Sequence, residues 1–220
     1  MLNYSTSEEN YIKAIYHLQK EGSVTTNELA AELQTRPASV TDMMKKLRTK
    51  KLVHYEAYKG FKLSADGKKL ALLIIRRHRL WEFFLAEKLK FSWDEVHAVA
   101  EDLEHVSSKK LIDKLDEFLG FPRYDPHGDP IPDANGKIET GKQVCLSDLP
   151  LNITGIVCYV SDQSSAMLEL LSHKKIGIGT KLEVKKKFSF DQSLEIKLRQ
   201  QSATNISGDL AKNIFVKYDE

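Results

Sequence analysis

The sequence predicts a multidomain chain that is mainly α-helical and ends in a small β-rich domain. Three observations support this prediction. Near the N-terminus, short helical segments joined by tight turns precede a hairpin pattern. A long and strongly apolar helical segment follows them. After a stretch rich in proline and glycine, short strands separated by turns replace the helical pattern.

Length and composition fit one large domain or two to three small ones. The chain has 220 residues, 41% of them hydrophobic, and a formal net charge of only +2. Its two cysteines, Cys145 and Cys158, are too few for a disulfide framework and fit a reducing cytosol. The first residues lack a signal-peptide pattern, and the apolar run at 70–75 is too short to span a bilayer. We therefore expect a soluble cytoplasmic protein without a membrane partner.

The first 64 residues predict a helix-turn-helix unit with a wing. Helical periodicity covers residues 7–20, 27–34 and 37–51, and Pro37 suits the first position of the third helix. Residues 52–64 then alternate around a Lys-Gly turn, as a hairpin does. Two short helices, a third that carries Ser and Thr early and basic residues late, and a hairpin are typical of DNA-binding domains.

The third helix and its flanks carry a local excess of positive charge. Between residues 36 and 51 there are six basic residues and one acidic residue, Asp42. Short polar side chains early in such a helix reach base edges, and basic side chains hold phosphates. The alternative is a solvated lysine face on a protein-binding module. The predicted DNA-binding residues are Arg36, Pro37, Ser39, Thr41, Lys45, Lys46, Arg48 and, at the wing tip, Lys59.

The remaining chain predicts a helical middle and a β-rich end. The helix at 65–89 is apolar on more than one side, which favours a dimer interface. One or two further helices lie within 93–119. Residues 121–142 hold four of the six prolines and three glycines, as a linker does. Beyond them only 164–173 looks helical, and 207–218 is expected to be strand. The predicted divisions are residues 1–64, 65–120, 121–142 and 143–220.

One helix of the middle region carries a stripe of histidines and carboxylates. His97, Glu101, Glu104 and His105 are spaced i, i+4, i+7 and i+8. At about 100° per residue they cover roughly 100° of the helix surface and border its apolar side. Unpaired carboxylates at the margin of a core are costly, and a bound cation relieves that cost.

A second pair, His78 and Glu82, shares one face of the preceding long helix. Imidazole and carboxylate ligands together suit divalent manganese, iron, cobalt or zinc. One alternative is a helix edge paired with lysines. Another is a zinc hydrolase, but the sequence has no HExxH pattern and no nucleophile motif. Next to a DNA reader, a regulatory metal is favoured, and we expect no enzyme.

These segments together resemble the diphtheria toxin repressor and manganese transport regulator family of metal-dependent bacterial repressors. The resemblance covers the whole chain. It implies a winged-helix domain, a helical dimerisation and metal-binding domain, and a C-terminal SH3-like barrel of the FeoA type. It also implies a homodimer on a double-stranded DNA operator. The segments that carry it are EENYIKAIYHL, TTNELAAELQTRPASVTDMMKKL, LVHYEAYKGFKLSADGKKLA, RRHRLWEFFL, VHAVAEDLEHVSS and PHGDPIP.

The resemblance implies a primary and an ancillary metal site. The primary site would use Glu101, Glu104 and His105, with a first-helix ligand at Asn10, where the family commonly has Asp or Met. Neighbouring Glu9 is the alternative first-helix ligand. Lys13 falls where some manganese-sensing members have a further carboxylate, so a two-metal cluster of that kind is not expected. The ancillary site would use His78, Glu82 and His97, closed by Asp162 or Gln163.

The implied function is a repressor that controls metal-ion homeostasis. In iron-sensing members the position of Glu101 is often Cys, so a carboxylate there favours Mn²⁺, with Fe²⁺ as the alternative. We expect the metal to clasp the first helix to the dimerisation helix and so fix the dimer in its DNA-competent form. The alternative is a winged-helix regulator controlled by a non-metal ligand, with the stripe as a salt-bridged surface.

Overall fold

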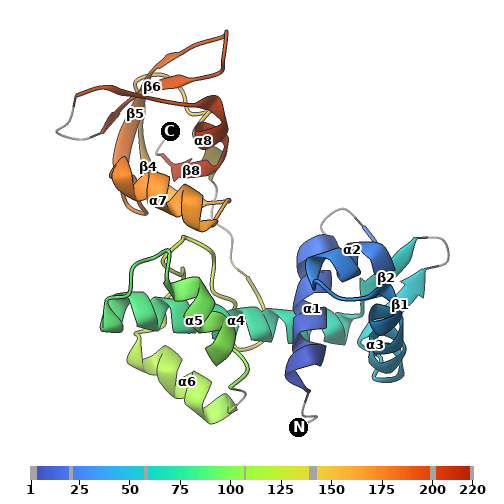
Figure 1. Cartoon of the computed structure of the whole chain (residues 1–220). Coiled ribbons are helices and arrows are strands. Elements are labelled where there is room, and N and C mark those ends of the chain that lie inside the picture. The colour runs from blue at the N-terminus through green and yellow to red at the C-terminus, as the bar shows by residue number, and fades with distance from the viewer. Residues whose placement is uncertain are drawn as a thin grey trace. The chain divides into compact units, whose positions relative to one another are not determined.

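The computed structural model describes residues 4–19, 22–56, 59–106, 108–138, 143–198 and 202–218 (Figure 1). The chain divides into two compact units, and the helices α4 and α5 contribute residues to both. The first unit contains Met1–Trp81, Ala100–Phe121 and Ile131–Ile138. The second contains Glu82–Val99, Pro122–Pro130 and Glu139–Glu220.

The first unit begins with the three helices and the hairpin that the sequence predicts. Ser5 and Thr25 each close a capping box with the glutamate three residues later, which fixes where the first two helices begin. The third helix begins at a proline. The elements are α1 (Thr6–Leu18), α2 (Thr26–Glu32), α3 (Pro37–Thr49), β1 (Val53–Glu56) and β2 (Gly60–Leu63).

The core of this region is built on one face of α3. Val40, Met44 and Leu47 recur at i, i+4 and i+7 and are buried with Ile15 of α1 and Leu29 of α2. Because these residues face inward, the intervening polar and basic positions of α3 face solvent, while Met43 is partly buried against the core. The helix therefore presents its polar and basic side outward.

The hairpin is held against the turn before α2. Val24 exchanges two backbone hydrogen bonds of 2.8 Å with Phe61. At Gly60, φ is +117°, and a Cβ there would collide with the carbonyl oxygen of Val24. Glycine is therefore required for the hairpin to approach this closely. The predicted wing is confirmed, with Val53 opposite Leu63.

Three helices follow the hairpin: α4 (Ala65–Leu89), α5 (Val96–Leu103) and α6 (Lys109–Phe118). The first has the predicted bounds. The helix that carries the stripe is shorter than predicted, because α5 ends at Leu103. Glu104 lies in the following turn, although its amide still donates to the carbonyl of Ala100 at 2.8 Å. Among the described residues, no helix has the length and apolarity needed to cross a membrane.

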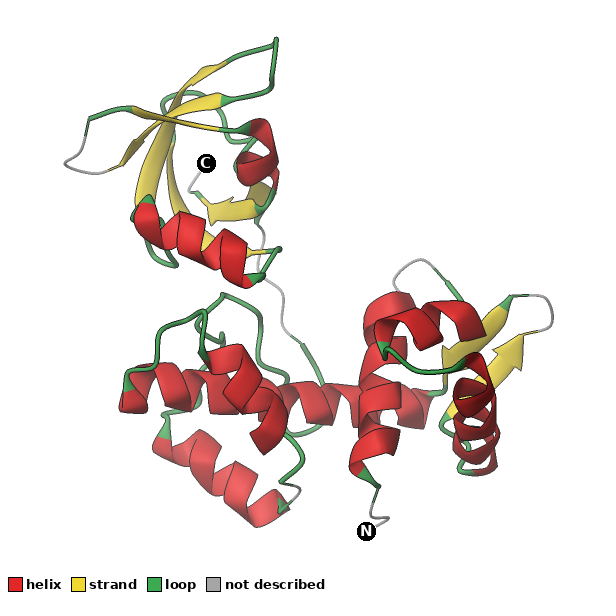
Figure 2. Cartoon of the chain, in the orientation of Figure 1, coloured by secondary structure: helices red, strands yellow, loops and turns green. Residues whose placement is uncertain are grey.

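The second unit contains an antiparallel six-stranded sheet in the order β3-β8-β4-β5-β6-β7, flanked by two helices (Figure 2). Its alternating residues build the core, for example Leu182 and Val184 on one strand. The elements are β3 (Val144–Cys145), β4 (Thr154–Val160), α7 (Ser165–His173), β5 (Lys181–Lys187), β6 (Leu194–Leu198), β7 (Thr204–Ile206), α8 (Gly208–Lys212) and β8 (Ile214–Lys217).

One local prediction here was wrong. Residues 207–218 do not form strand throughout, because Gly208–Lys212 is the short helix α8. The hydroxyl of Ser207 accepts a hydrogen bond from the backbone amide of Leu210 at 3.2 Å and so caps this helix. The strand starts only at Ile214. The predicted fold class, mainly α-helical with a small β domain, is confirmed.

Candidate metal centre and DNA-contacting face

The predicted DNA-contacting residues lie on the outward side of the winged-helix region. Thr41 and Lys45 each make one polar contact within α3. The Thr41 hydroxyl donates to the carbonyl of Pro37 at 3.0 Å, and Lys45 pairs with Asp42 at 3.1 Å. The exposed positions are Arg36, Pro37, Ser39, Thr41, Lys45, Lys46, Arg48 and Lys59.

A buried carboxylate ties α3 to α1 beneath this face. Glu8 Oε1 lies 2.6 Å from Lys50 Nζ and 3.2 Å from Lys46 Nζ. Burial alone would raise the pKa of Glu8, but hydrogen bonds from Lys50, the Ser5 backbone and Lys46 lower it to about 2. Lys46 is therefore engaged by a buried carboxylate, while Arg48 is exposed and Lys45 pairs with the exposed carboxylate of Asp42.

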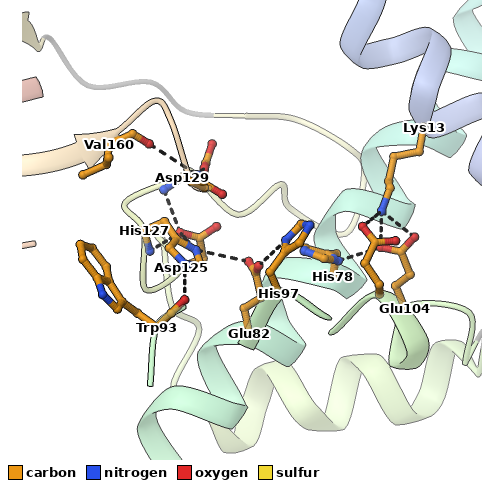
Figure 3. A network of polar contacts seen from close by, with 12 residues as sticks. Lys13, His78, Glu82, Trp93, His97, Glu104, Asp125, His127, Asp129 and Val160 are labelled. Carbon is orange, nitrogen blue, oxygen red and sulfur yellow. Dashed lines mark hydrogen bonds and ion pairs between the residues drawn. The ribbon is translucent and has the colours of Figure 1, made fainter. Parts of the chain in front are cut away.

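The predicted primary set is drawn together in the first unit, but around a lysine. Lys13 Nζ lies 2.6 Å from Glu101 Oε1 and 2.8 Å from each carboxylate oxygen of Glu104 (Figure 3). The imidazole of His78 donates from Nδ1 to Glu104 Oε2 at 2.8 Å. Burial would raise the pKa of Glu104, yet the His78 hydrogen bond and the Lys13 charge hold it below its ordinary value.

The other members of the primary set form a second cluster in the same unit. His105 donates from Nδ1 to Glu9 Oε2 at 2.8 Å, and Arg77 reaches Glu9 Oε1 at 2.7 Å. Arg77 also donates to the backbone carbonyl of Glu104 at 2.6 Å. Glu9, rather than Asn10, is therefore the α1 residue that meets His105. The amide oxygen of Asn10 is buried without a hydrogen-bond partner among the described residues.

As arranged, this primary set does not fit a divalent metal ion. Three carboxylates, from Glu9, Glu101 and Glu104, already face two permanent cations, Lys13 and Arg77. A metal ion would need the same carboxylate oxygens that accept hydrogen bonds from the lysine ammonium.

The predicted ancillary set falls in both units. His78 belongs to the first, while Glu82 and His97 belong to the second. Within the second unit, the half-exposed imidazole of His97 donates from Nδ1 to Glu82 Oε1 at 3.2 Å. The two C-terminal candidates have other contacts. Asp162 Oδ1 accepts from the Ser164 amide at 2.9 Å, and the Gln163 amide donates to Asp129 Oδ2.

A different set of ligand atoms converges in the second unit, where Glu82 meets Asp125 and His127. The three offer ligand atoms within 4.8 Å of one another, and all three residues are buried. His127 Nδ1 lies 3.9 Å from Glu82 Oε2 and 4.0 Å from Asp125 Oδ1. One imidazole and two carboxylates suit divalent manganese or iron.

The tautomer of His127 prepares it for a cation. Its Nε2 donates to the backbone carbonyl of Trp93 at 2.8 Å (Figure 3). A proton is thus fixed on Nε2, and in the neutral imidazole Nδ1 carries the lone pair. That Nδ1 is fully buried and has no hydrogen-bond partner among the described residues. A buried lone pair beside two carboxylates fits a metal ion. Glu82, Asp125 and His127 therefore suit a divalent cation, whereas the cluster around Lys13 does not.

A tight turn presents both Asp125 and His127. Asp125 Oδ1 accepts from the backbone amides of His127 at 2.8 Å and Asp129 at 2.9 Å, as in an Asx turn. Gly128, with φ at +88°, follows, and its Cα packs against the backbone of β4. A Cβ at this position would collide with the carbonyl oxygen of Cys158.

Known families cover most of the chain. A model of the iron-dependent repressor N-terminal DNA-binding domain matches residues 3–61. A model of the iron-dependent repressor metal-binding and dimerisation domain matches 64–133, and the FeoA domain model matches 144–218. The chain is 34% identical over 116 residues to the HTH-type transcriptional regulator MntR of Oceanobacillus iheyensis. That alignment covers 52% of this chain and 78% of the relative.

The chain belongs to the diphtheria toxin repressor and manganese transport regulator family. A solved structure described as a manganese-dependent transcriptional repressor complex with manganese is similar, with a TM-score of 0.82 and 31% identity. It covers 96% of this chain and 99% of that one. The iron-dependent repressor IdeR of Mycobacterium leprae is 29% identical over 150 residues, 64% of this chain. This match spans 65% of the relative's length.

Family membership confirms the resemblance and the domain types that the sequence predicted. Members of this repressor family are transcriptional regulators rather than enzymes. The sequence prediction did not include Asp125 and His127 among the candidate ligands, because both lie in the segment expected to be a linker. A histidine flanked by aspartates within a proline- and glycine-rich stretch was the available signal.

Proposed function

We propose that this protein is a metal-dependent repressor that binds double-stranded DNA as a homodimer and takes Mn²⁺, with Fe²⁺ as the alternative. The observation that carries the proposal is the buried, unpartnered Nδ1 of His127 beside the carboxylates of Glu82 and Asp125. Two further features support the proposal. The third helix of the chain carries an exposed basic face, and the family consists of metal-dependent repressors.

The chemistry of the ligands supports a metal at this set. A bound divalent ion would supply positive charge to two buried carboxylates and accept the His127 lone pair, which relieves the cost of their burial. Oxygen-rich ligands and an imidazole, without a thiolate, favour Mn²⁺ or Fe²⁺ over softer ions. Glu82 comes from α4, and Asp125 and His127 come from the segment that follows α6. Occupation would therefore tie these two parts of the second unit together.

The DNA-binding side of the proposal rests on α3 and the wing. The exposed residues at the start of α3 suit base edges, and Lys45 and Arg48 suit phosphates. In a homodimer, two such helices would read half-sites about 34 Å apart, or a multiple of that spacing. Exposed apolar residues on α6, Leu111 and Phe118, are compatible with a subunit interface. If metal favours the DNA-competent form, DNA should tighten metal binding to the same extent.

The test compares metal binding and DNA binding in His127→Ala and in the wild type. Manganese binding to chelator-stripped protein is followed by loss of the free-Mn²⁺ EPR signal. DNA affinity is measured by fluorescence anisotropy on duplexes selected from a random pool, with Mn²⁺ or with EDTA. A control variant, His173→Ala, removes an exposed histidine at the end of α7.

The wild type and His173→Ala should bind Mn²⁺ and gain at least tenfold in DNA affinity when it is present. His127→Ala should bind Mn²⁺ at least tenfold more weakly and lose most of that gain. A His127→Ala protein that responded to Mn²⁺ like the wild type would refute the assignment of the metal to this set.

One observation favours a second candidate function, a winged-helix regulator controlled by a non-metal ligand. That alternative expects the Glu101–Glu104 stripe to be salt-bridged, and Lys13 pairs with both residues. DNA affinity that is equal in Mn²⁺ and in EDTA, for every selected duplex, would support it over the metal-dependent repressor.

A further inference from the structure

Lys13 satisfies the carboxylates that the sequence assigned to a metal. An ammonium has three N–H donors. Here three carboxylate oxygens, one from Glu101 and two from Glu104, lie at 2.6–2.8 Å from Nζ. The Lys13 side chain is 15% exposed and that of Glu104 is 0% exposed. Water and salt therefore screen this pairing much less than they screen a surface ion pair.

A metal ion and this ammonium cannot use the same oxygens together. Carboxylate oxygens bind transition-metal ions at about 2.0–2.2 Å. An ion at that distance from Glu104 would lie next to the ammonium, and the two cations would repel each other. To admit the ion, Lys13 would have to leave a nearly buried position and give up all three acceptors.

The neighbouring residues add to this competition rather than relieve it. Arg77 pairs with Glu9 at 2.7 Å and also holds the backbone of Glu104. Asn10, one turn before Lys13 on α1, offers a neutral amide in place of a carboxylate. Three carboxylates therefore face two permanent cations, and the single remaining negative charge attracts a divalent ion only weakly against the lysine.

We propose that Lys13 is a built-in cation that occupies the Glu101–Glu104 pair in place of a metal and ties α1 to the end of α5 in the metal-free protein. The contact joins residues 88 and 91 positions apart in the sequence. Metal control then belongs to Glu82, Asp125 and His127, and in that respect the inference rests on the proposed function. The tie made by Lys13 itself does not depend on that function.

The experiment counts Mn²⁺ ions bound per full-length chain, by EPR, in variants measured side by side. Lys13→Gln removes the ammonium and leaves both carboxylates. Lys13→Gln combined with Glu104→Gln also replaces the buried Glu104 carboxylate, which a new ion would need, with a neutral amide. Lys110→Gln, an exposed lysine on α6, is the matched control.

Lys13→Gln should bind one more Mn²⁺ per chain than the wild type, the double variant should return to the wild-type number, and Lys110→Gln should not change it. Glu104→Gln alone should leave the number unchanged. The inference is overturned if Lys13→Gln gains no ion, or if Glu104→Gln alone loses one.

Thermal unfolding gives a second readout that does not depend on counting ions. In EDTA, the Tm of Lys13→Gln should lie below that of the wild type by about 5 °C, and Mn²⁺ should raise it more than it raises the wild-type Tm. An unchanged Tm in EDTA counts against the tie. If Lys13→Gln does not fold, Lys13→Met, which keeps the apolar stem, takes its place.

The two proposals can fail separately. If the wild type binds no Mn²⁺ but Lys13→Gln binds one ion, the proposed function fails and the inference stands. If the wild type binds Mn²⁺ through His127 and Lys13→Gln binds no more than the wild type, the inference alone fails.

Discussion

Trp93 and His127 are joined twice. The indole stacks on the imidazole, with ring centroids 6.1 Å apart and an interplanar angle of 18°, and the backbone carbonyl of Trp93 accepts the Nε2 proton of His127 at 2.8 Å. The carbonyl fixes the tautomer of the candidate ligand. The indole lies close enough to report what binds to it.

Mn²⁺ should therefore quench the fluorescence of Trp93. Trp93→Phe should still bind Mn²⁺ by EPR with an affinity within about threefold of the wild type, because the backbone carbonyl remains. It should lose most of the Mn²⁺-dependent change in fluorescence, since only Trp81 is left. Full quenching in Trp93→Phe would show that the ion binds near Trp81 instead.

Gly128→Ala should destabilise the second unit by about 3 kcal/mol, because it adds a steric collision with the Cys158 carbonyl to the backbone strain at positive φ. Gly120→Ala is the matched control. Gly120 has φ at +76°, and no described atom lies within 4 Å of its would-be Cβ. It should therefore cost only about 1 kcal/mol. Urea unfolding measures both, and equal losses would contradict the close packing at Gly128.

Lys45→Ala and Arg48→Ala should each weaken DNA binding by a similar factor on every duplex tested. Each should also reduce the slope of log affinity against log salt concentration by about 1, as expected for one lost phosphate contact. Both residues are exposed on α3. Lys110→Ala, on α6, should leave the slope unchanged. If all three variants had the same salt-dependence slope as the wild type, Lys45 and Arg48 would not contact phosphates, and α3 would not form the DNA interface.

The Glu8 ion pairs should make folding stability depend on pH in the acid range. The pKa of Glu8 is about 2 in the folded protein against an ordinary value of 4.5. Its contribution to the free energy of unfolding is therefore complete above about pH 4.5 and is lost as pH falls toward 2. The stability gap between the wild type and Glu8→Gln should close over that window.

Lys50→Met tests the cause of that dependence. Lys50 is the nearer of the two lysines that pair with Glu8. With it removed, Glu8→Gln should cost less stability at pH 7 than it does in the wild type, because residues in direct contact do not contribute additively. An unchanged cost would assign the effect to burial rather than to the ion pair.

The local elements could be predicted from the sequence alone. Apolar residues at i, i+4 and i+7 place Val40, Met44 and Leu47 in the core, and the same spacing turns the basic side of α3 outward. The start of α4 and the glycine turn of the wing follow from equally local signals. The end of α5 was less predictable. The stripe pattern continues through Glu104, while the backbone leaves the helix after Leu103.

The sequence by itself determined most of the helices, the wing, the basic face and the family to which the chain belongs, because these depend on residues close together along the chain. The short helix α8 and the end of α5 were the exceptions. Only the tertiary structure decided which charges meet. Lys13 contacts Glu104, which lies 91 positions later in the sequence. His127 lies near Glu82, although α5 and α6 separate the two residues along the chain. Periodicity places a side chain on a face, but the partner across that face is set by packing. Whether a row of carboxylates holds a metal or a lysine is therefore decided in three dimensions.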